Sequence, residues 1–600
     1  MSKVIEDEKL KMVGWYDPSQ LLDTAKKTAI STTVGKFADP RLGMADPKPG
    51  KIFDYSKELT ETKEIIAPNE DIFAPNESRE RSEIWIDYVA DVGDGWNPTY
   101  AVAYTLARET LEVGDAEEGL KRGEILIFGG DGVYPTASSN EYKRRLLIPY
   151  RMAFKASGTT AAAFSGAVNL KKEPHIFALP GNHDWYDSLV AFKELFCSHI
   201  FNDRRFADAW RTRQKRSYFT LKLPGNWWLL AVDLQLSHNI DVSQLIYFES
   251  IVGQMEKGDK IIFCVPEPYW VKSIKYDEFN LAEIEEKEDS IQKLEDFFEK
   301  RGVEVKVYIA GDLHHYRRFQ NADRVQKITS GGGGAFLHPT HDFDFRKHDN
   351  DKTKGFSLES DYPAFNESRK QDWKNFWFFW NNPKFGIVTA IIYAILAWLI
   401  NGRIAEGKNF SWWEAVLVTV DRIIFTPLAT IVVVLMLLAV VLFTDSSSWR
   451  QKWFGGFAHG LAHLAAIFFV GWWAYRISIW IIGHCNVENS TCRNLIWFAC
   501  VLVIPAIGGY LIGAIIMGLY LFISLHIFGR HDNEAFSALK IEDYKNFLRL
   551  HIDKSGALTI YPIKIERVPR DWKPMGKDRI EYYEPEIAIK PELIEKPISV

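Results

Sequence analysis

Four short stretches of the sequence place carboxylates, an amide and imidazoles directly after apolar runs. The stretches are IDYVADVGD, ILIFGGD, IFALPGNHD and VYIAGDLHH, and their polar residues are Asp91, Asp94, Asp131, Asn182, His183, Asp184, Asp312 and His314. Carboxylate and amide oxygens combined with imidazole nitrogens form a ligand set for divalent cations such as Mn, Fe, Zn or Mg. The residue types therefore predict a metal centre assembled from distant parts of the chain.

The apolar run before each polar stretch has the length and composition of a buried β-strand. The run at 176–179, for example, stops at Pro180 and Gly181, where the chain must turn. A single Asp at a strand end is more often a turn or helix-cap residue. The succession of GGD, GNHD and GDLHH, each after an apolar strand, favours a site at one edge of a sheet.

At these residues the sequence resembles the calcineurin-like metallophosphoesterases, whose pattern runs D-x-H, G-D, G-N-H-D/E, a lone His, and G-H-x-H. The match is strong at GGD and GNHD. It is partial elsewhere, because Gly93 stands where the first His is expected, Glu267 is the nearest donor to the lone His, and Asp312 replaces the His that begins the last motif. The resemblance covers roughly residues 80–345 and implies a two-sheet sandwich flanked by helices.

The resemblance also implies two divalent cations, with Asp131 as the carboxylate that bridges them. The first cation would take Asp91, Asp131 and His314, with Asp94 or water in place of the missing imidazole, and the second would take Asp131, Asn182 and Asp312, with Glu267 as a further candidate. Carboxylates in place of imidazoles make the site harder, which favours Mn or Mg over Zn; Mn is the first choice, with Fe, Mg and Zn as alternatives. Two such cations, about 3.5–4 Å apart, can clamp a phosphoryl group and activate water.

Two further features of this region are predicted to serve the site. His183 matches the position that in the family donates a proton to the leaving group, with Asp184 as its orienting partner. The glycine-rich run at 329–341 is similar to the closing segment of the family domain and permits close backbone approach, although a plain flexible loop is the alternative. His338 and His341 in this run either face the metals or lie on the surface.

A basic run follows GNHD and alternates with Phe and Trp. Its residues Arg204, Arg205 and Arg211 are candidates for a clamp on a phosphate or a lipid headgroup. Runs of charge are more often solvated faces, and that interpretation stays open. The net charge of -6 and the pI near 6.2 give no global basic field, so nucleic-acid binding is not expected.

Strand-like and helical patterns alternate in the first part of the chain, which predicts an α/β fold with buried sheets. The predicted strands are 83–91, 124–130, 175–180, 217–223, 227–234, 260–265, 305–310 and 324–329. The predicted helices are about 98–113, 139–156, 186–200, 242–255 and 288–301. Near the C-terminus, IEDYKNFLRLHI suggests an amphipathic helix and ALTIYPIKI a strand.

Long apolar runs after residue 384 predict an all-α transmembrane bundle of about four helices. The predicted spans are 385–400, 423–443, 457–482 and 495–528, the last kinked near Pro505, with two helices as the alternative there. Lys and Arg are more frequent on the side that carries the N-terminal part and the C-terminal tail, which predicts that this side is cytoplasmic. The absence of an apolar leader at the first residues agrees with that orientation.

Five segments follow from these patterns. They are an N-terminal extension at 1–80, the phosphoesterase-like domain at 81–345, a linker and interfacial aromatic segment at 346–384, the transmembrane region at 385–528 and a cytosolic tail at 529–600. The leading hypothesis is a membrane-anchored hydrolase of a phosphoester or pyrophosphate bond, with membrane lipids as partners and a lipid-linked phosphate or a nucleotide as substrate. A non-hydrolytic sensor or scaffold is the alternative, because imidazoles are missing from the motifs. The oligomeric state stays open.

Overall fold

A computed structural model describes residues 9–24, 26, 52–57, 80–114, 119–158, 174–197, 205–207, 210–234, 239–271, 281–341, 355–401, 411–446, 448–577 and 580–600. The chain divides into two compact units. Unit 1 comprises Met1–Val13, Thr24–Ser368 and Lys540–Val600, and unit 2 comprises Gly14–Asp23 and Arg369–Leu539. Unit 1 is mixed α/β and unit 2 is helical.

The first sheet of unit 1 has nine strands in the order β20-β17-β16-β2-β5-β6-β8-β7, with β21 paired to β17. Their bounds are β2 Ile84–Val89, β5 Ile125–Gly129, β6 His175–Leu179, β7 Arg205–Ala207, β8 Trp210–Thr212, β16 Lys545–Ile552, β17 Leu558–Ile565, β20 Glu592–Leu593 and β21 Ile598–Ser599. Strands β2, β5, β6 and β8 are parallel neighbours, so their carboxyl ends meet at one edge.

The second sheet has eight strands in the order β1-β9-β10-β11-β12-β14-β13-β15. Their bounds are β1 Phe53–Asp54, β9 Phe219–Leu223, β10 Trp227–Ala231, β11 Lys260–Cys264, β12 Glu304–Ala310, β13 Tyr316–Gln320, β14 Gln326–Ser330 and β15 Ser357–Tyr362. Two small hairpins stand apart, β3 Thr110–Leu111 with β4 Leu120–Lys121, and β18 Trp572–Met575 with β19 Tyr582–Pro585. Each of the eight predicted strands corresponds to a strand of these two sheets.

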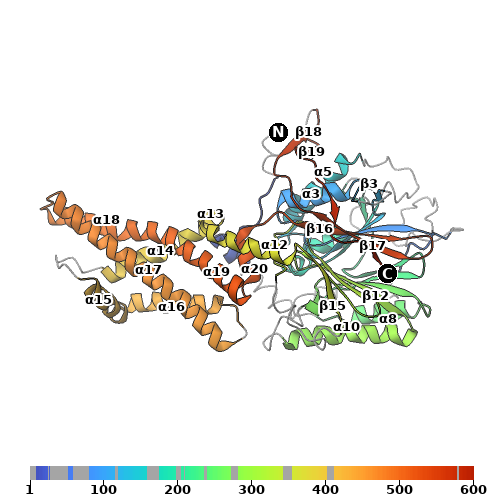
Figure 1. Cartoon of the computed structure of the whole chain (residues 1–600), viewed down its shortest axis with the longest axis horizontal. Coiled ribbons are helices and arrows are strands. Elements are labelled where there is room, and N and C mark those ends of the chain that lie inside the picture. The colour runs from blue at the N-terminus through green and yellow to red at the C-terminus, as the bar shows by residue number, and fades with distance from the viewer. Residues whose placement is uncertain are drawn as a thin grey trace. The chain divides into compact units, whose positions relative to one another are not determined.

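The two sheets pack face to face, and helices cover their outer faces (Figure 1). Successive side chains of a strand point to opposite faces of the sheet, so alternate residues contribute to two different cores. On β2, Ile84, Ile86 and Tyr88 enter the core between the sheets, whereas Trp85 and Val89 pack under the helices on the other side. Strands buried on both faces explain the continuous apolar runs of the sequence.

The helices of unit 1 lie between strands along the chain. They are α3 Trp96–Leu106, α4 Ser139–Tyr142, η2 Lys143–Leu147, α5 Ile148–Ala156, α6 Asn182–Trp185, α7 Val190–Phe192, η3 Lys193–Cys197, α8 Val242–Val252 and α10 Leu281–Arg301. Helices α3 and α5 cover the nine-stranded sheet, and α8 and α10 cover the eight-stranded sheet (Figure 1). The expected α/β architecture with two sheets is therefore present.

The end of the chain belongs to unit 1 rather than forming a separate tail. Strand β16 pairs with β2 on one side and with β17 on the other. The prediction of a helix at IEDYKNFLRLHI is wrong, because burial on both faces between two strands overrides the local helical period. Of the segment predicted as the tail, residues 540–600 belong to unit 1 and residues 529–539 to unit 2.

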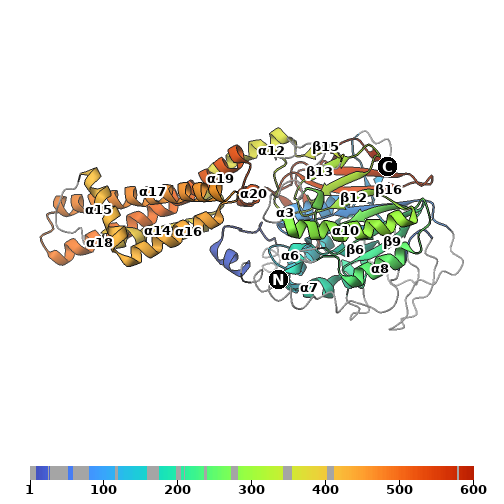
Figure 2. The same ribbon diagram turned by 90° about the horizontal axis from the view of Figure 1, so that it is seen from below.

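Unit 2 consists of helices, several of them long and apolar (Figure 2). Their bounds are α12 Phe365–Gln371, which begins in unit 1, η4 Asp372–Trp377, α13 Phe378–Asn381, α14 Pro383–Asn401, α15 Trp412–Phe425, α16 Pro427–Phe443, α17 Trp449–His484, α18 Ser490–Gly508, η5 Gly509–Gly513, α19 Ala514–Phe528 and α20 Asp532–Leu539. Among the described residues, three helices are long and apolar enough to cross a membrane, or four if the bent pair α15 and α16 is one span.

Two predictions about these helices have different outcomes. The stretch Ser490–Phe528 passes Pro505 as one candidate span, with a π-helical turn at Gly509–Gly513, in agreement with the kinked single helix. The span predicted at 423–443 instead straddles a break, because α15 ends at Phe425 and α16 begins at Pro427. Proline removes the backbone donor that a continuous helix would need there.

Candidate metal centre

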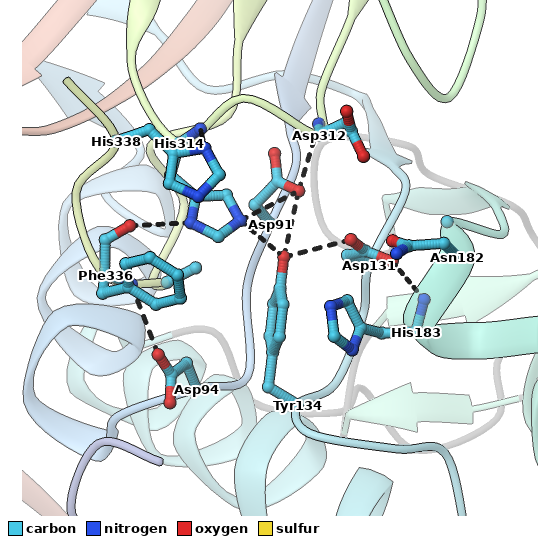
Figure 3. A network of polar contacts seen from close by, with 12 residues as sticks. Asp91, Asp94, Asp131, Tyr134, Asn182, His183, Asp312, His314, Phe336 and His338 are labelled. Atoms are coloured by element: carbon cyan, nitrogen blue, oxygen red, sulfur yellow. Dashed lines mark hydrogen bonds and ion pairs between the residues drawn. The ribbon is translucent and has the colours of Figure 1, made fainter. Parts of the chain in front are cut away.

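Three aspartates occupy the same local position after three different strands. Asp91, Asp131 and Asp312 each lie two residues beyond the last residue of β2, β5 and β12. All three have left-handed backbones, with φ of 57°, 47° and 68°. Asp tolerates this conformation better than most residues because its short side chain can bond locally. The Asp91 and Asp131 carboxylates lie beside the Tyr134 hydroxyl, and the Asp312 carboxylate lies farther from that hydroxyl (Figure 3).

The backbones of the first two turns are joined directly. The Asp91 N–H donates to Gly130 O at 3.0 Å, and the Val92 N–H donates to Asp131 O at 3.0 Å. The third turn comes from the other sheet, and its Asp312 N–H donates to the Asp91 carboxylate at 3.1 Å. The site thus lies where the carboxyl ends of both sheets meet, whereas the sequence pattern had indicated one edge of a single sheet.

The hydroxyl of Tyr134 lies among the converging groups. Its oxygen is 3.1 Å from Asp91 Oδ1, 3.1 Å from Asp131 Oδ2 and 2.9 Å from His314 Nε2 (Figure 3). Burial, followed by the charges of Asp131 and Asp91, raises the pKa of Tyr134 well above its usual value. The hydroxyl is therefore protonated at neutral pH in the absence of a cation.

The tautomer of His314 follows from its other ring nitrogen. His314 Nδ1 lies 2.7 Å from Phe336 O, and a carbonyl can only accept, so Nδ1 carries a proton. Burial lowers the pKa of His314 well below its usual value, so the ring is neutral and Nε2 presents a lone pair. His338 stacks on this ring with centroids 3.9 Å apart and holds its plane.

The hydrogen-bond acceptors around the Tyr134 hydroxyl outnumber the protons available to them, so a cation fits among these residues. Two carboxylate oxygens and the His314 lone pair face one hydroxyl, which has one proton to donate. The second oxygen of Asp91 is buried without a hydrogen-bond partner among the described residues. Burial, with Asp131 and Asp312 nearby, raises the pKa of Asp91 well above its usual value. A cation among these acceptors would supply the missing positive charge.

The spacing of the donors agrees with that count. Neighbouring ligands of an octahedral ion with bonds of about 2.1 Å are about 3.0 Å apart, which matches the contacts of the Tyr134 oxygen. Tyr134 therefore fits as a fourth donor beside Asp91, Asp131 and His314. Among the residues that the structure describes, no three His, Cys, Asp or Glu side chains are grouped to hold a metal ion by themselves. With the Tyr134 oxygen, a bound cation would have four donors from these residues.

The GNHD stretch wraps around Asp131. The His183 N–H donates to Asp131 Oδ1 at 2.8 Å. A Cβ at Gly181 would collide with the same carboxylate, which explains why glycine stands there. Asn182 lies beside Asp131 in Figure 3, and its amide donates to Tyr186 Oη at 3.3 Å. Of these neighbours, Asn182 is the one that the sequence assigned to a second cation, together with Asp131 and Asp312.

The partner predicted for His183 needs correction. His183 Nδ1 lies 2.7 Å from the carbonyl of Pro135, so that carbonyl orients the ring. The Asp184 carboxylate instead accepts from the N–H groups of Gly132 and Gly181 and from the hydroxyl of Tyr142. Burial, followed by the charge of Asp131, raises the pKa of Asp184 to about 7. Because its carboxylate accepts from Gly132, Gly181 and Tyr142, Asp184 holds the loops around Asp131 together.

Asp94 is also placed differently from the prediction. One of its oxygens accepts the Val13 N–H at 2.7 Å, and the other accepts the Phe336 N–H at 3.3 Å. Figure 3 shows this carboxylate on the far side of Phe336 from the converging donors. Asp94 thus ties two backbone segments together instead of replacing the missing imidazole.

Glu267 is buried in the turn after β11, next to Pro266, whose carbonyl lies near Gly130.

Arg211, one of the three arginines of the proposed clamp, does not lie at the site. Arg211 is buried in β8 and pairs in register with His175, the first residue of β6. His183 follows the last residue of β6, so Arg211 lies toward the opposite edge of the sheet, with β6 spanning about 13 Å between the edges. The side chain of Arg205 and the whole of Arg204 lie outside the described residues.

The glycine run approaches the site closely, as the sequence predicted. A Cβ at Gly331 would collide with the Asp91 carboxylate and with Leu313 O. The same run carries Phe336, whose carbonyl orients His314, and His338, which stacks on it. His341 is buried and bonds Ser368 Oγ at 2.8 Å, so it does not face the donors.

Sequence reasoning missed Tyr134 and Phe336. Tyr134 stands three residues after Asp131 in GGDGVYP, so its hydroxyl was available as a signal at a turn already assigned to the site. Phe336 acts through its backbone carbonyl, which any residue would supply. Nothing in its side chain could have marked it.

No family model matches the chain, and the search of the curated proteins found no match. Two solved structures are similar to part of it. One is GAP50, the anchor in the inner membrane complex of Plasmodium, at 11% identity and a TM-score of 0.29 over 43% of this chain and 74% of that chain. The other is PhoD, at 10% identity and a TM-score of 0.28 over 47% of this chain and 63% of that chain, which is less than two thirds of its length. Neither likeness, at these values, assigns an activity.

Proposed function

We propose that unit 1 is a metal-dependent phosphoesterase that cleaves a phosphoester or pyrophosphate bond. The observation that carries the proposal is the convergence of Asp91, Asp131 and His314 on the hydroxyl of Tyr134. The hydrogen-bond acceptors at this site, where the two sheets meet, outnumber the protons available to them, and such a site suits a divalent cation. Because most of the donor atoms are oxygens, Mn is the first choice. The resemblance of GGD and GNHD to the calcineurin-like family supports the same reaction.

Each residue has a defined task in this proposal. Asp131 presents one oxygen to the Tyr134 side and the other to the GNHD side, so it suits the bridge between two cations. Asn182 and Asp312 would complete the second position. Such a pair, when bound, supplies Lewis-acid chemistry that polarises a phosphoryl group and activates water.

His183 is the residue proposed to exchange a proton with the leaving group. The Pro135 carbonyl fixes the proton on Nδ1, so Nε2 is the nitrogen whose protonation changes. The ring lies over Tyr134, with centroids 4.3 Å apart, on the same side as the converging donors (Figure 3). Its backbone N–H remains bonded to Asp131, so the ring is held beside the bridging carboxylate.

The apolar helices of unit 2 lead us to propose a membrane location and a lipid-linked phosphate as the first substrate class, with a nucleotide as the second. Lys and Arg near the helix ends favour a cytoplasmic unit 1. Anchoring would concentrate the enzyme where lipid-linked substrates are, and membrane lipids would surround unit 2.

The test is hydrolysis of an aryl phosphodiester by the purified full-length protein. We expect activity with Mn²⁺, loss on chelation, and recovery when Mn²⁺ is returned. Asp131→Asn should remove the activity, whereas Asp296→Asn on the exposed face of α10 should leave it unchanged. Equal rates for wild type and Asp131→Asn would reject the proposal.

A second candidate is a non-hydrolytic sensor or scaffold. The observation that favours it is the lack of a three-member group of His, Cys, Asp or Glu among the described residues. Metal analysis separates the two candidates, because bound metal that Asp131→Asn removes supports the enzyme. Protein that binds no metal in excess Mn²⁺ supports the scaffold.

A further inference from the structure

The break between α15 and α16 is sharp and short. The two helices make an angle of 94°, with Thr426 between them. Pro427 begins α16 and has no N–H to donate to the carbonyl of Ile423. The hydroxyl of Thr430 supplies that bond at 2.5 Å and also lies 3.3 Å from the carbonyl of Thr426. The Thr430 hydroxyl therefore replaces the backbone hydrogen bond that Pro427 cannot make.

Helix α15 has three distinct faces. One face, which carries Ala415, Val418 and Thr419, lines a cavity shared with α14 and α17. The opposite face carries an apolar stripe at helical spacing, and its members Trp413, Leu417, Val420 and Ile424 are 63%, 55%, 48% and 60% exposed. Between these faces lie the exposed carboxylates Glu414 and Asp421, seven residues apart. An apolar side flanked by charge suits a boundary between lipid and water.

The position of α15 along α17 agrees with such a boundary. Helix α17 has 36 residues, which makes it about 54 Å long, whereas a bilayer core is about 30 Å thick. Exposed Trp residues lie near both ends of α17, Trp449 and Trp453 near its start and Trp473 and Trp480 toward its end, and about 30 Å separates Trp453 from Trp473 along the helix, the spacing of two interfacial belts. The residues of α17 that pack on α15 lie within 467–475, at the level of the second belt.

The connectivity of unit 1 determines whether the chain crosses the membrane an even or an odd number of times. Ser368 and Lys540 both belong to unit 1, and β16 lies in the same sheet as β2. A folded sheet cannot straddle a bilayer, so the chain between these residues must cross an even number of times. Helices α14, α17 and the stretch Ser490–Phe528 give three crossings. Helix α16 is the remaining apolar helix, and its 17 residues extend about 26 Å.

We propose that α16 alone makes the fourth crossing and that α15 lies flat at the far surface of the membrane. Its stripe of Trp413, Leu417, Val420 and Ile424 enters the boundary between headgroups and acyl chains, and Glu414 and Asp421 face water. The inference rests on the proposed membrane location of unit 2. The partner of this surface is the lipid bilayer itself.

Spin labels on the full-length protein in lipid nanodiscs test this directly. The exposed or partly exposed Cys485, Cys492 and Cys500 are first replaced by Ser, and single labels are then placed by Leu417→Cys, Ile424→Cys, Asp421→Cys, Leu428→Cys and Leu435→Cys. Collision rates with oxygen and with a water-soluble nickel complex give the depth of each label. Residues seven apart on a crossing helix differ in depth by about 10 Å, whereas on a flat helix they do not.

The expected result is equal, shallow depth at positions 417 and 424, access to the nickel complex at 421, and a difference of about 10 Å between 428 and 435. A difference of about 10 Å between 417 and 424 would show a re-entrant or crossing α15, and it would overturn this proposal alone. Access of the nickel complex to both labels on α16 would overturn the membrane location of unit 2 as well.

Discussion

Arg549 and Asp87 form a fully buried ion pair, although 462 positions separate them in the chain. The guanidinium donates to both carboxylate oxygens, at 2.7 and 3.1 Å, and also to the carbonyls of Leu120 and Leu106. The carboxylate accepts a further bond from the Gly123 N–H. This pair joins β16 to β2 in the sheet that carries Asp91 and Asp131.

Removing one member of this pair should destabilise unit 1. We expect Arg549→Met to cost about 3–5 kcal/mol, because Asp87 would remain buried and uncompensated. A thermal melt should show a fall of roughly 5 °C or more in the midpoint of unit 1. The combined change Asp87→Leu with Arg549→Met should recover part of the loss. Arg570→Met, at a more exposed ion pair, should cost less than about 1 kcal/mol.

Tyr134→Phe should weaken metal binding while leaving the ring packing in place. The variant lacks the oxygen that faces Asp91, Asp131 and His314, so we expect the affinity for Mn²⁺ to fall at least about tenfold. Isothermal titration of the full-length protein with Mn²⁺ measures the change. Tyr561→Phe on β17 is the matched control. Unchanged affinity in Tyr134→Phe would show that the phenol is not a donor.

Asp94→Ala should lower stability without removing metal. The substitution leaves the N–H groups of Val13 and Phe336 without their acceptors, at about 1–3 kcal/mol for each buried group. Asp94→Asn keeps one accepting oxygen and should lose less. Metal content by mass spectrometry should match the wild type in both variants. If Asp94→Ala lost metal as completely as Asp131→Asn, Asp94 would have to be counted among the metal ligands.

Lys545 should make the stability of unit 1 depend on alkaline pH. Burial lowers the pKa of Lys545 from 10.5 to about 8, although Asp94 and other carboxylates oppose the shift. The unfolded chain therefore binds more protons between pH 8 and 10.5, so stability rises with pH across that window. The gain is on the order of 3 kcal/mol. Denaturant unfolding of Lys545→Met should lack this rise, and an identical pH profile in both proteins would contradict the assignment.

Much of unit 1 could be predicted from its sequence because its strands are buried on both faces. Continuous apolar runs such as Ile125–Gly129 and Lys260–Cys264 leave few alternatives to a central strand. The carboxylates that follow them converge because parallel strands share an edge. The convergence of Asp91 and Asp131 was therefore predictable from local patterns, whereas Asp312 follows a strand of the other sheet and meets them only because the two sheets pack together.

The remaining features depend on contacts that local patterns do not encode. The partner of His183 is a backbone carbonyl at Pro135, and backbone atoms carry no sequence signal. Arg211 follows the site closely in sequence, but its register with His175 turns it toward the other edge. Strand β16 has a helical period, and only its place between β2 and β17 decides its structure.

The return of β16 to β2 has a consequence for biosynthesis. A ribosome that has finished β2, β5 and β6 must still translate every helix of unit 2 before β16 emerges. Until then, one edge of β2 has no neighbouring strand, and exposed edges invite pairing with other chains. In the proposed membrane location of unit 2, delivery of the helices to the bilayer would come before closure of the sheet, and a nascent chain stalled at that stage would need protection by a chaperone.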